Sequence, residues 1–563
     1  MFNSIFKTFG FLTLGLAWLS YDHYRPWTSF HAEALAFAGL GFLAFGRYCA
    51  TAVITLPKIP LVIAIVAIVP WVQYVVGILL FSGDALMASL YIGGLAVAVC
   101  MGYSLATDDD NLSATSKISQ LIAPIFQILW LVAIVSAAIG LLQWLSLQEP
   151  IGMYVVQTDA GDRARGNLGQ PNQLATLLLM GIASLAFSYE SKHIGRIGLS
   201  VGVLFLTLTL ILTQSRASMV SAGVMAIFLI SKIHIIKSRL RQTDICIWIL
   251  IFSVGVIALP YISDLLLMSG SRGLITGTDS ERMLIWKQIS SAIFQAPFLG
   301  YGWNQTTAAQ TSGSLVATGD VTYTNAHNFF LDVISWNGIP LGLLIISFCI
   351  FWFLSRMYSV KQTDAAYAMS CLLPLSVHSM FEYPYAYAYF LITAGMMVGI
   401  VEASYLKSKT IQLYPRWMAL GIASCFVVCS YLVYEYLLVE EDFRVVRFEN
   451  LRIGQTQIDY QVPNVWMLSQ MTSMLKAARQ NAVPNMSTED IDNLRKASLR
   501  FPYGPISLRY ALAMGLNGNP LGASRQLVII RSMYGERYYQ AAVTVLREQQ
   551  SEKYPQLSQV IAP

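Results

Sequence analysis

The chain has 563 residues, of which 55% are hydrophobic and 12% charged, and its formal net charge is +5. Together with a mean hydropathy of +0.56, this composition excludes an ordinary soluble domain and predicts an all-α, polytopic helical membrane protein. The seven cysteines lie in apolar stretches without a Cys-x-x-Cys pair or a Cys/His cluster, so neither a disulfide framework nor a metal site is expected. We expect membrane lipids as partners, no nucleic acid and no cofactor.

About thirteen apolar stretches meet the requirement of roughly 20 mainly apolar residues for a membrane-spanning helix. The first, about residues 5–20, lacks a clear small-residue cleavage site, so we expect an uncleaved helix. The stretches centre near residues 12, 40, 70, 95, 133, 180, 204, 226, 256, 342, 372, 396 and 427.

Lys and Arg indicate the orientation of these helices, because short cytoplasmic loops carry an excess of positive charge. With the N-terminus inside, fifteen cations fall on the cytoplasmic side: Lys7, Arg47, Lys58, Lys117, Lys192, Arg196, Lys232, Lys237, Arg239, Arg241, Arg356, Lys361, Lys407, Lys409 and Arg416. The opposite side, up to residue 438, receives seven: Arg25, Arg163, Arg165, Arg216, Arg272, Arg282 and Lys287. Residues 1–438 are therefore predicted to form a transmembrane domain, followed by a polar domain outside the cytoplasm.

The polar segment 439–563 is predicted to be a separate helical domain. Ser487 and Asp490 have the spacing of a capping box. Two amphipathic helices are then separated at residues 517–520, as in a tetratricopeptide (TPR) unit. The domain is either a platform for a protein partner or a module that merely packs on the membrane face.

The stretch RARGNLGQPNQLATLLLM, residues 163–180, is the first polar cluster at the outer face. Its two glycines permit tight or left-handed turns, and its proline suits the first turn of a helix. Arg165, Asn167, Gln170 and Asn172 are candidate substrate-binding residues, because guanidinium and amide groups can bind a sugar or a phosphate. A plain helix cap would explain the proline and one asparagine, but not four amides beside two arginines.

Cations on the outer side oppose the usual excess of positive charge in cytoplasmic loops. An anionic ligand would explain their presence there. Arg216, in TQSRASM, interrupts a long apolar run at a turn of a few residues. Arg282 and Lys287 lie in a large outward loop, about residues 269–326. The alternatives are a snorkelling arginine for Arg216 and a solvated loop face for the other two.

Arg282 and Lys287 are five residues apart on a helix predicted to be amphipathic and interfacial. Met283, Trp286 and Ile289 would lie on the side of this helix that could rest on lipid.

Two histidines lie in the remaining outer clusters. His327, flanked by Asn325 and Asn328, lies where a polar stretch becomes apolar, and the alternative interpretation is a helix cap or a structural histidine. His378 and Glu382 lie in HSMFEYPYAYAYF, whose tyrosines are typical of an interfacial aromatic belt. Because all these clusters map to one face, they predict one site for a substrate with a polyprenyl tail, a pyrophosphate and a sugar.

Five stretches resemble the PglL-type bacterial O-oligosaccharyltransferases of the O-antigen ligase and polymerase (Wzy_C-like) superfamily. They are RGNLGQPNQLATLLL, SRA, SERMLIWKQ, AHNFFLDVISWNGIPLG and HSMFEYPYAYAYFL, and they span roughly residues 150–405. The resemblance implies a glycosyltransferase of the bacterial inner membrane. Such an enzyme transfers a glycan from undecaprenyl pyrophosphate to Ser or Thr of a periplasmic protein, commonly a type IV pilin.

The chemistry of this reaction suggests roles for three residues. Arg216 and Arg282 would stabilise charge that accumulates on the pyrophosphate, supported by Arg165 and Lys287. His327 would act as the general base for the acceptor hydroxyl, and its contact with phosphate is an alternative.

Two other functions stay open at this stage. The first is an O-antigen ligase or polysaccharide polymerase of the same superfamily, which has less need of a periplasmic domain of about a hundred residues. The second is a secondary transporter of an anionic solute. The sequence shows no internal repeat and no paired broken helices in corresponding halves, which disfavours transport.

Overall fold

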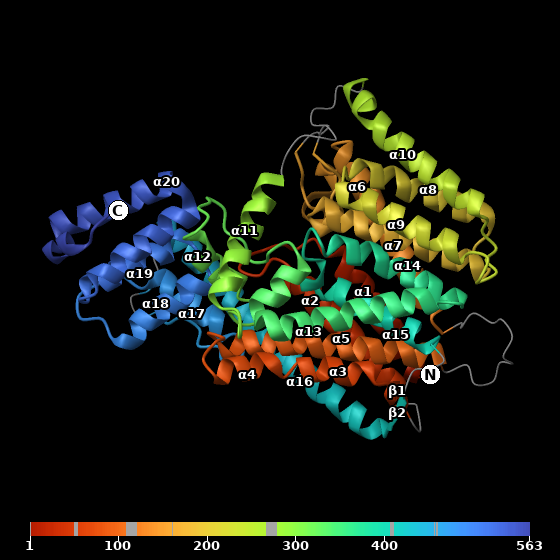
Figure 1. The fold of residues 1–563 in the computed structure, drawn as a ribbon, viewed down its shortest axis with the longest axis horizontal. Helices are drawn as coiled ribbons and strands as arrows, with labels where there is room; N and C mark the ends of the chain where they lie inside the picture. The colour runs from red at the N-terminus through yellow and green to blue at the C-terminus, as the bar shows by residue number, and fades with distance from the viewer. Residues whose placement is uncertain are drawn as a thin grey trace. The chain divides into compact units, whose positions relative to one another are not determined.

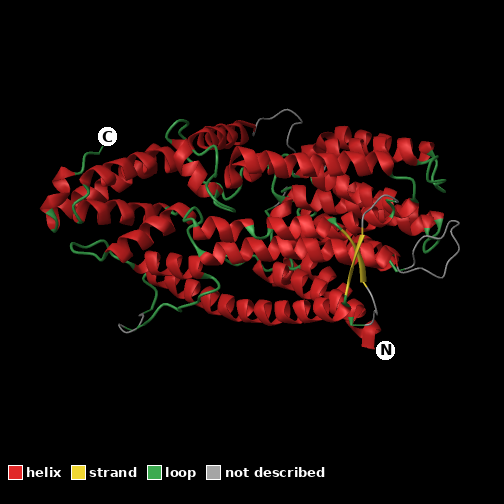
Figure 2. Ribbon diagram, turned by 60° about the horizontal axis from the view of Figure 1, so that its bottom comes forward, coloured by secondary structure: helices red, strands yellow, loops and turns green. Residues whose placement is uncertain are grey.

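The computed structural model describes residues 2–49, 54–107, 121–159, 162–265, 279–405, 410–454, 457 and 460–562. It is built almost entirely of helices (Figures 1 and 2). Within these residues, β1 (Ile54–Pro57) and β2 (Thr410–Leu413) form one antiparallel pair with Ile54 opposite Leu413. Lys117, Arg272, Lys407, Lys409 and the part of the predicted outer loop before residue 279 lie outside the described residues.

The α-helices follow one another with short connections. They are α1 Phe2–Leu19, α2 Phe30–Tyr48, α3 Ile59–Val66, α4 Val69–Val75, α5 Ser82–Thr107, α6 Ala123–Trp144, α7 Pro171–Glu190, α8 Arg196–Leu212, α9 Arg216–Lys232, α10 Gln242–Leu265, α11 Asp279–Gln295, α12 Thr306–Ser314, α13 Phe329–Ser359, α14 Thr363–His378, α15 Ala388–Ala403, α16 Pro415–Asn450, α17 Ser469–Arg479, α18 Thr488–Arg500, α19 Gly504–Leu516 and α20 Pro520–Glu552. Short 3-10 helices are η1 Glu149–Tyr154, η2 Gly166–Leu168, η3 Pro384–Ala386 and η4 Pro555–Gln559.

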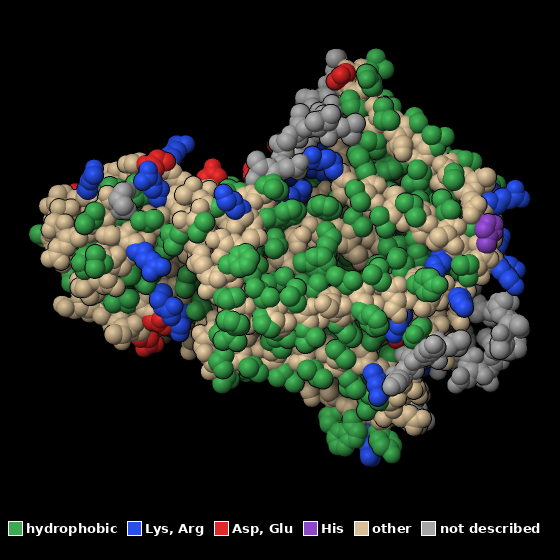
Figure 3. All heavy atoms as spheres, in the orientation of Figure 1, with side chains coloured by type: hydrophobic (Ala, Val, Ile, Leu, Met, Phe, Trp, Pro, Cys, Tyr) green, Lys and Arg blue, Asp and Glu red, His purple; other side chains and the backbone are tan. Residues whose placement is uncertain are grey.

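A helix lies at every one of the predicted centres, so the prediction of a helical membrane protein is confirmed. Among the described residues, six helices are long and apolar enough to cross a membrane: α5, α6, α7, α10, α13 and α16. Shorter apolar helices cover Ser4–Leu19, Ile59–Val75, Arg196–Leu212 and Ala388–Ala403. Hydrophobic side chains are spread over the visible face of the apolar helices (Figure 3).

The chain divides into two compact units, each assembled from separate segments. Unit 1 comprises Met1–Val66, Tyr91–Thr276 and Ile350–Cys429, and unit 2 comprises Ala67–Leu90, Gly277–Cys349 and Ser430–Pro563. In unit 1, α7 is the most deeply buried of the candidate spans, with 94% of its apolar window buried. It packs against α6, α8, α9 and α14, as expected for a helix that is apolar all round.

Two hydrophobic cores lie in the described residues of unit 2. The core around α11 includes Ile285, Ile289 and Ala292, with Trp286 packed against it. The prediction that Ile289 could face lipid is therefore wrong, because its side chain is fully buried, whereas Met283 is 61% exposed and Trp286 is half-buried. The second core is formed by α19, α20 and η4.

The local signals in the C-terminal segment are confirmed. The Ser487 hydroxyl accepts a hydrogen bond from the backbone N–H of Asp490 at 3.0 Å and caps α18. The predicted interruption at residues 517–520 separates α19 from α20, which pack together. The TPR-like class remains a prediction.

A kink near the start of α13 shapes unit 2. Gly338 has a φ of 77°, and a Cβ there would lie 2.3 Å from the carbonyl oxygen of Phe298. Pro340 has no N–H, so the Trp336 carbonyl lacks its helical donor. That carbonyl accepts instead from Gln73 Nε2 at 2.9 Å and from the Gly302 N–H at 3.1 Å.

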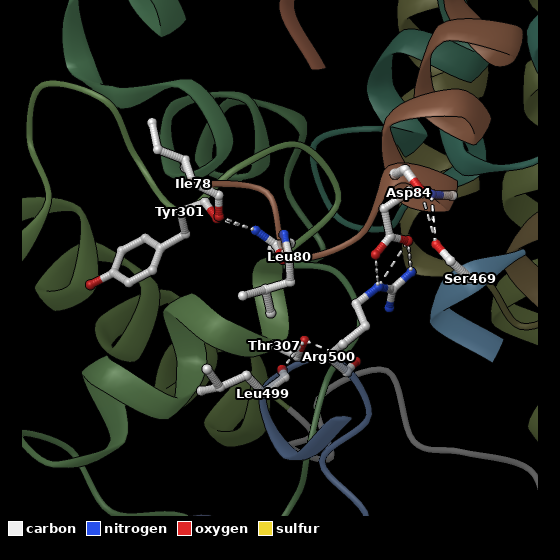
Figure 4. A network of polar contacts seen from close by, with 11 residues as sticks. Ile78, Leu80, Asp84, Tyr301, Thr307, Ser469, Leu499 and Arg500 are labelled. Carbon is white, nitrogen blue, oxygen red and sulfur yellow. Dashed lines mark hydrogen bonds and ion pairs between the residues drawn. The ribbon is translucent and has the colours of Figure 1, made fainter. Parts of the chain in front are cut away.

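Buried charged side chains also attach the C-terminal helices to the rest of unit 2. Glu435 of α16 accepts from the backbone N–H groups of residues 466–468. The Arg500 guanidinium of α18 points at the Asp84 carboxylate of α5 (Figure 4), and Arg500 Nε lies 3.0 Å from Asp84 Oδ2. The side chains of Asp84 and Arg500 are only 2% and 13% exposed, so this ion pair is largely buried.

We expect Arg500→Met to lower the free energy of unfolding by about 3–5 kcal/mol, because it leaves the buried Asp84 carboxylate uncompensated. Arg495→Met on the same helix is the matched control. Arg495 and its partner Asp492 are each 41% exposed, so their pair should contribute at most about 1 kcal/mol. Denaturant unfolding of the full chain in detergent measures the free energy of unfolding of both variants. Equal losses in the two variants would show that the Arg500–Asp84 pair contributes no more than the exposed pair.

Candidate functional site

The first predicted cluster forms a tight loop at the start of α7 in unit 1. Gly166 and Gly169 have φ values of 57° and 72°, which confirms the predicted left-handed turns. The Gln143 side chain of α6 fixes this loop. Its Oε1 accepts from the N–H groups of Arg165 (3.1 Å) and Gly166 (2.7 Å), and its Nε2 donates to the Gly166 carbonyl at 3.1 Å.

Two of the candidate amides bind backbone groups. Asn167 is 3% exposed, and its Nδ2 donates to the carbonyls of Leu19 (2.9 Å) and Tyr154 (3.0 Å). Its Oδ1 accepts from the N–H of Val156 at 3.2 Å. Gln170 caps α7, because its Oε1 accepts from the N–H of residue 173 at 2.8 Å. Both side chains shape the loop, and their contact with a substrate remains a prediction.

Asn172 joins two of the predicted clusters. Its Nδ2 donates to Glu382 Oε1 at 3.2 Å, and its Oδ1 accepts from Arg163 Nη2 at 3.4 Å. Arg163 Nε also donates to the Thr213 carbonyl at 2.7 Å, at the end of α8. Arg163 is one of the predicted outward cations but is not among the predicted site residues. Its signals were that outward position and its place two residues before Arg165.

Two further candidate residues are neighbours in sequence of members of this network: His378 of Glu382, and Arg165 of Arg163. His378 is 1% exposed, and its Nδ1 lies 2.8 Å from the Thr176 hydroxyl, which also donates to the Asn172 carbonyl. Arg165 Nη2 donates to Asp162 Oδ2 at 2.5 Å. Burial and the contact with Thr176 show that His378 helps to join α14 to α7, and its contact with a substrate remains a prediction.

Arg216 is the first residue of α9 and is exposed. The turn before it is short, because α8 ends at Leu212 and Ser215 caps α9 by accepting from the N–H of Ser218. The unpaired N–H groups at a helix start carry partial positive charge. An exposed guanidinium at this point makes the start of α9 suitable for an anion.

The second predicted cluster lies in unit 2, at the start of α13. Asn328 Oδ1 accepts from the N–H groups of Phe330 (3.0 Å) and Leu331 (3.1 Å), so Asn328 is a helix cap. His327, just before it, is half-buried and has a φ of 54°. Asn325 is 5% exposed, and its Nδ2 has no hydrogen-bond partner among the described residues.

Arg282 lies near the same loop. Burial raises the pKa of Tyr323, Glu281 and Asp320 raise it further, and the positive charge of Arg282 opposes the shift. The Tyr323 ring meets the His327 ring edge-on, with centroids 5.4 Å apart. Unit 2 therefore gathers Arg282, Tyr323 and His327, while Lys287, one turn further along α11, is exposed. Sequence analysis missed Tyr323, which lies four residues before His327 in a loop without periodicity.

The peptide before His327 is held from two helices. The Ala326 N–H donates to Asp332 Oδ1 of α13 at 3.0 Å, and the Ala326 carbonyl accepts from Trp286 Nε1 of α11 at 3.0 Å. Sequence analysis assigned no role to Asp332, although a carboxylate inside an apolar run is a detectable signal.

The described residues form two sets with different chemistry. In unit 1, Arg163 contacts the Asn172 amide, Arg165 contacts the Asp162 carboxylate, and Arg216 is exposed at the start of α9, whereas unit 2 supplies Arg282 near the loop that carries His327. No group of three or more His, Cys, Asp and Glu side chains within the described ranges could hold a metal ion. Arginines can stabilise the charge of a phosphate, and an imidazole can accept a proton from a hydroxyl group.

Three family models match successive parts of the chain. The model described as protein glycosylation ligase matches residues 164–187, and the O-antigen ligase model matches residues 201–346. The model of the C-terminal part of the virulence factor membrane-bound polymerase matches residues 366–549. The first two matches include the loop before α7, Arg216, Arg282 and His327.

Two proteins of Acinetobacter baylyi are similar to this chain. A general O-oligosaccharyltransferase is 26% identical over 540 residues, which cover 93% of this chain and 92% of that protein. A ComP-specific O-oligosaccharyltransferase is 28% identical over 443 residues, which cover 76% of this chain and 78% of that protein. These similarities confirm that the chain is related to the PglL-type O-oligosaccharyltransferases within the O-antigen ligase superfamily.

Proposed function

We propose that this chain transfers a glycan from undecaprenyl pyrophosphate to Ser or Thr of a periplasmic protein such as a type IV pilin. The observation that carries the proposal is the similarity to a general O-oligosaccharyltransferase over 93% of the chain, including the C-terminal helices. The gathering of Arg282, Tyr323 and His327 in unit 2 supports the same chemistry.

In the proposed reaction, the acceptor hydroxyl oxygen bonds to the anomeric carbon of the glycan. The bond from that carbon to the pyrophosphate oxygen breaks, and undecaprenyl pyrophosphate leaves with the electron pair. Arg216 and Arg282 stabilise the charge that accumulates on the phosphates, with Arg165 and Lys287 in support. His327 takes the hydroxyl proton. Asn167, Gln170, Asn172, Asn325, Asn328, His378 and Glu382 shape or contact the binding site.

The proposed topology is a bacterial inner-membrane protein with about thirteen crossings and its active site at the periplasmic face. It rests on the fifteen inward and seven outward cations. Residues 439–563 would then form a periplasmic domain that selects or positions the acceptor protein, as helical-hairpin scaffolds do for peptides.

A second candidate is ligation of a polysaccharide onto a lipid or glycan acceptor. The O-antigen ligase match over residues 201–346 favours it. Co-expression of the chain with a lipid-linked glycan pathway separates the two candidates. A mass shift on a pilin supports the first, and a glycan found only on lipid supports the second.

His327→Ala should lower turnover by roughly 100-fold or more, because the acceptor hydroxyl loses its general base. Expression and binding of the lipid-linked donor should be retained. His193→Ala, at an exposed histidine after α7, is the control. Glycosylation by His327→Ala close to the wild-type rate, measured by acceptor mass, would show that His327 is not the base.

Arg216→Ala and Arg282→Ala should each abolish or severely reduce transfer. Arg216→Lys and Arg282→Lys should restore only part of it, because an ammonium cannot bind phosphate in a bidentate manner. Initial rates at saturating acceptor measure the difference. Full activity in both Lys variants would leave a general electrostatic role and rule out bidentate binding.

A reporter that functions only in the periplasm should be active when fused after Pro563, because an odd number of crossings places the C-terminus outside. The matched control is the same reporter fused after Lys237, in a loop rich in inward cations. Activity of a cytoplasmic reporter after Pro563 would overturn the thirteen-helix topology.

A further inference from the structure

Three consecutive residues at the start of α12 bind three different parts of unit 2. Gln305 binds the segment before α5, because its Oε1 accepts from the Leu80 N–H at 3.2 Å and its Nε2 donates to the Ile78 carbonyl at 3.0 Å. Thr307 Oγ1 lies 2.9 Å from the Leu499 carbonyl in α18 (Figure 4). Thr306, between them, binds the helix that begins beside His327.

Thr306 belongs to a buried chain of hydrogen bonds. Its hydroxyl donates to Asp332 Oδ1 at 2.7 Å and accepts from Trp336 Nε1 at 2.8 Å. The same Asp332 oxygen accepts from the Ala326 N–H. Thr306, Asp332 and Ala326 have no exposed surface, and Trp336 is 5% exposed. Because none of these groups reaches water, each depends on its protein partner.

This chain of bonds ends at the peptide before His327. The Ala326 N–H is bound by Asp332 and its carbonyl by Trp286, so the peptide is fixed at both polar groups. The next residue, His327, has a φ of 54°. A non-glycine residue keeps such a left-handed conformation only where its surroundings fix it.

We propose that Thr306 and Asp332 are positioning residues for His327. The Asp332 carboxylate holds the Ala326 N–H, and the Thr306 hydroxyl orients the carboxylate. The backbone before His327 is therefore fixed in one conformation. This conformation orients the imidazole toward the acceptor hydroxyl. Neither residue touches the substrate. The role of His327 as base rests on the proposed function, whereas the restraint of its loop does not.

Thr306→Val tests this proposal, because it keeps the side-chain volume and removes the hydroxyl. Thr306→Ser retains the hydroxyl and is the rescue variant. Thr311→Val is the matched control, since Thr311 lies on the same helix and, within the described part of the chain, its hydroxyl bonds only to the Thr307 carbonyl of that helix, at 2.9 Å. Each full-length variant is purified in detergent.

Two measurements are made on each variant. Hydrogen exchange of the segment 322–331, without any substrate, reports the restraint of the His327 loop. Thr306→Val should accelerate this hydrogen exchange roughly 10-fold. Steady-state glycosylation should show kcat lowered about 10- to 100-fold with the acceptor KM unchanged, because only the orientation of the base is lost. Thr306→Ser should restore most of the protection from exchange and most of the kcat.

Exchange and kcat within about twofold of wild type for Thr306→Val would overturn the proposal. Equal losses for Thr311→Val would also overturn it, since they would show a general effect on α12. If Thr306→Val does not accumulate, Thr306→Ala carries the same test, because it also removes the hydroxyl that donates to Asp332. A failed proposed function would appear instead as an active His327→Ala enzyme with the exchange results intact.

Discussion

Hydrogen bonding of the backbone at breaks between helices is the constraint on which the rest of this structure depends. In an apolar environment each unpaired N–H or carbonyl group costs several kcal/mol, so every break requires a polar side chain nearby. Gln143 satisfies the loop before α7, Asn167 fixes the same loop from the other side, and Gln73 takes the carbonyl that Pro340 leaves without a donor. These three buried polar side chains lie at the breaks for this reason.

The same constraint explains why the candidate site lies at breaks and why its residues differ in role. Asn167, Gln170 and Asn328 are largely occupied by backbone groups, so they determine the shape of the loops. Arg216 is exposed at the start of a helix, and His327 is half-buried. The amides therefore build the loops, whereas Arg216 and His327 are the side chains that stay accessible at them.

The sequence predicted the features that depend on local signals. The length of the apolar stretches placed the membrane helices, Pro171 marked the start of α7, and the Ser487 cap was recognised from its spacing. Features that depend on distant contacts could not be predicted. Ile289 packs on Ala309 and Ala326 in place of lipid, and Glu435, inside the apolar run of α16, binds the backbone of residues 466–468. The importance of Asp332 likewise depends on Thr306, 26 residues earlier in the chain.

The way in which His327 is held has a consequence for its chemistry. The proposed general base needs a fixed orientation and also access to the acceptor hydroxyl. Here the restraint acts on the neighbouring peptide, through the fully buried Ala326 and Asp332, while the ring itself remains half-buried. Restraint and accessibility are thereby divided between adjacent residues. Since Thr307, next to Thr306, binds α18, the restraint on this histidine and the attachment of the C-terminal helices begin at the same turn of α12.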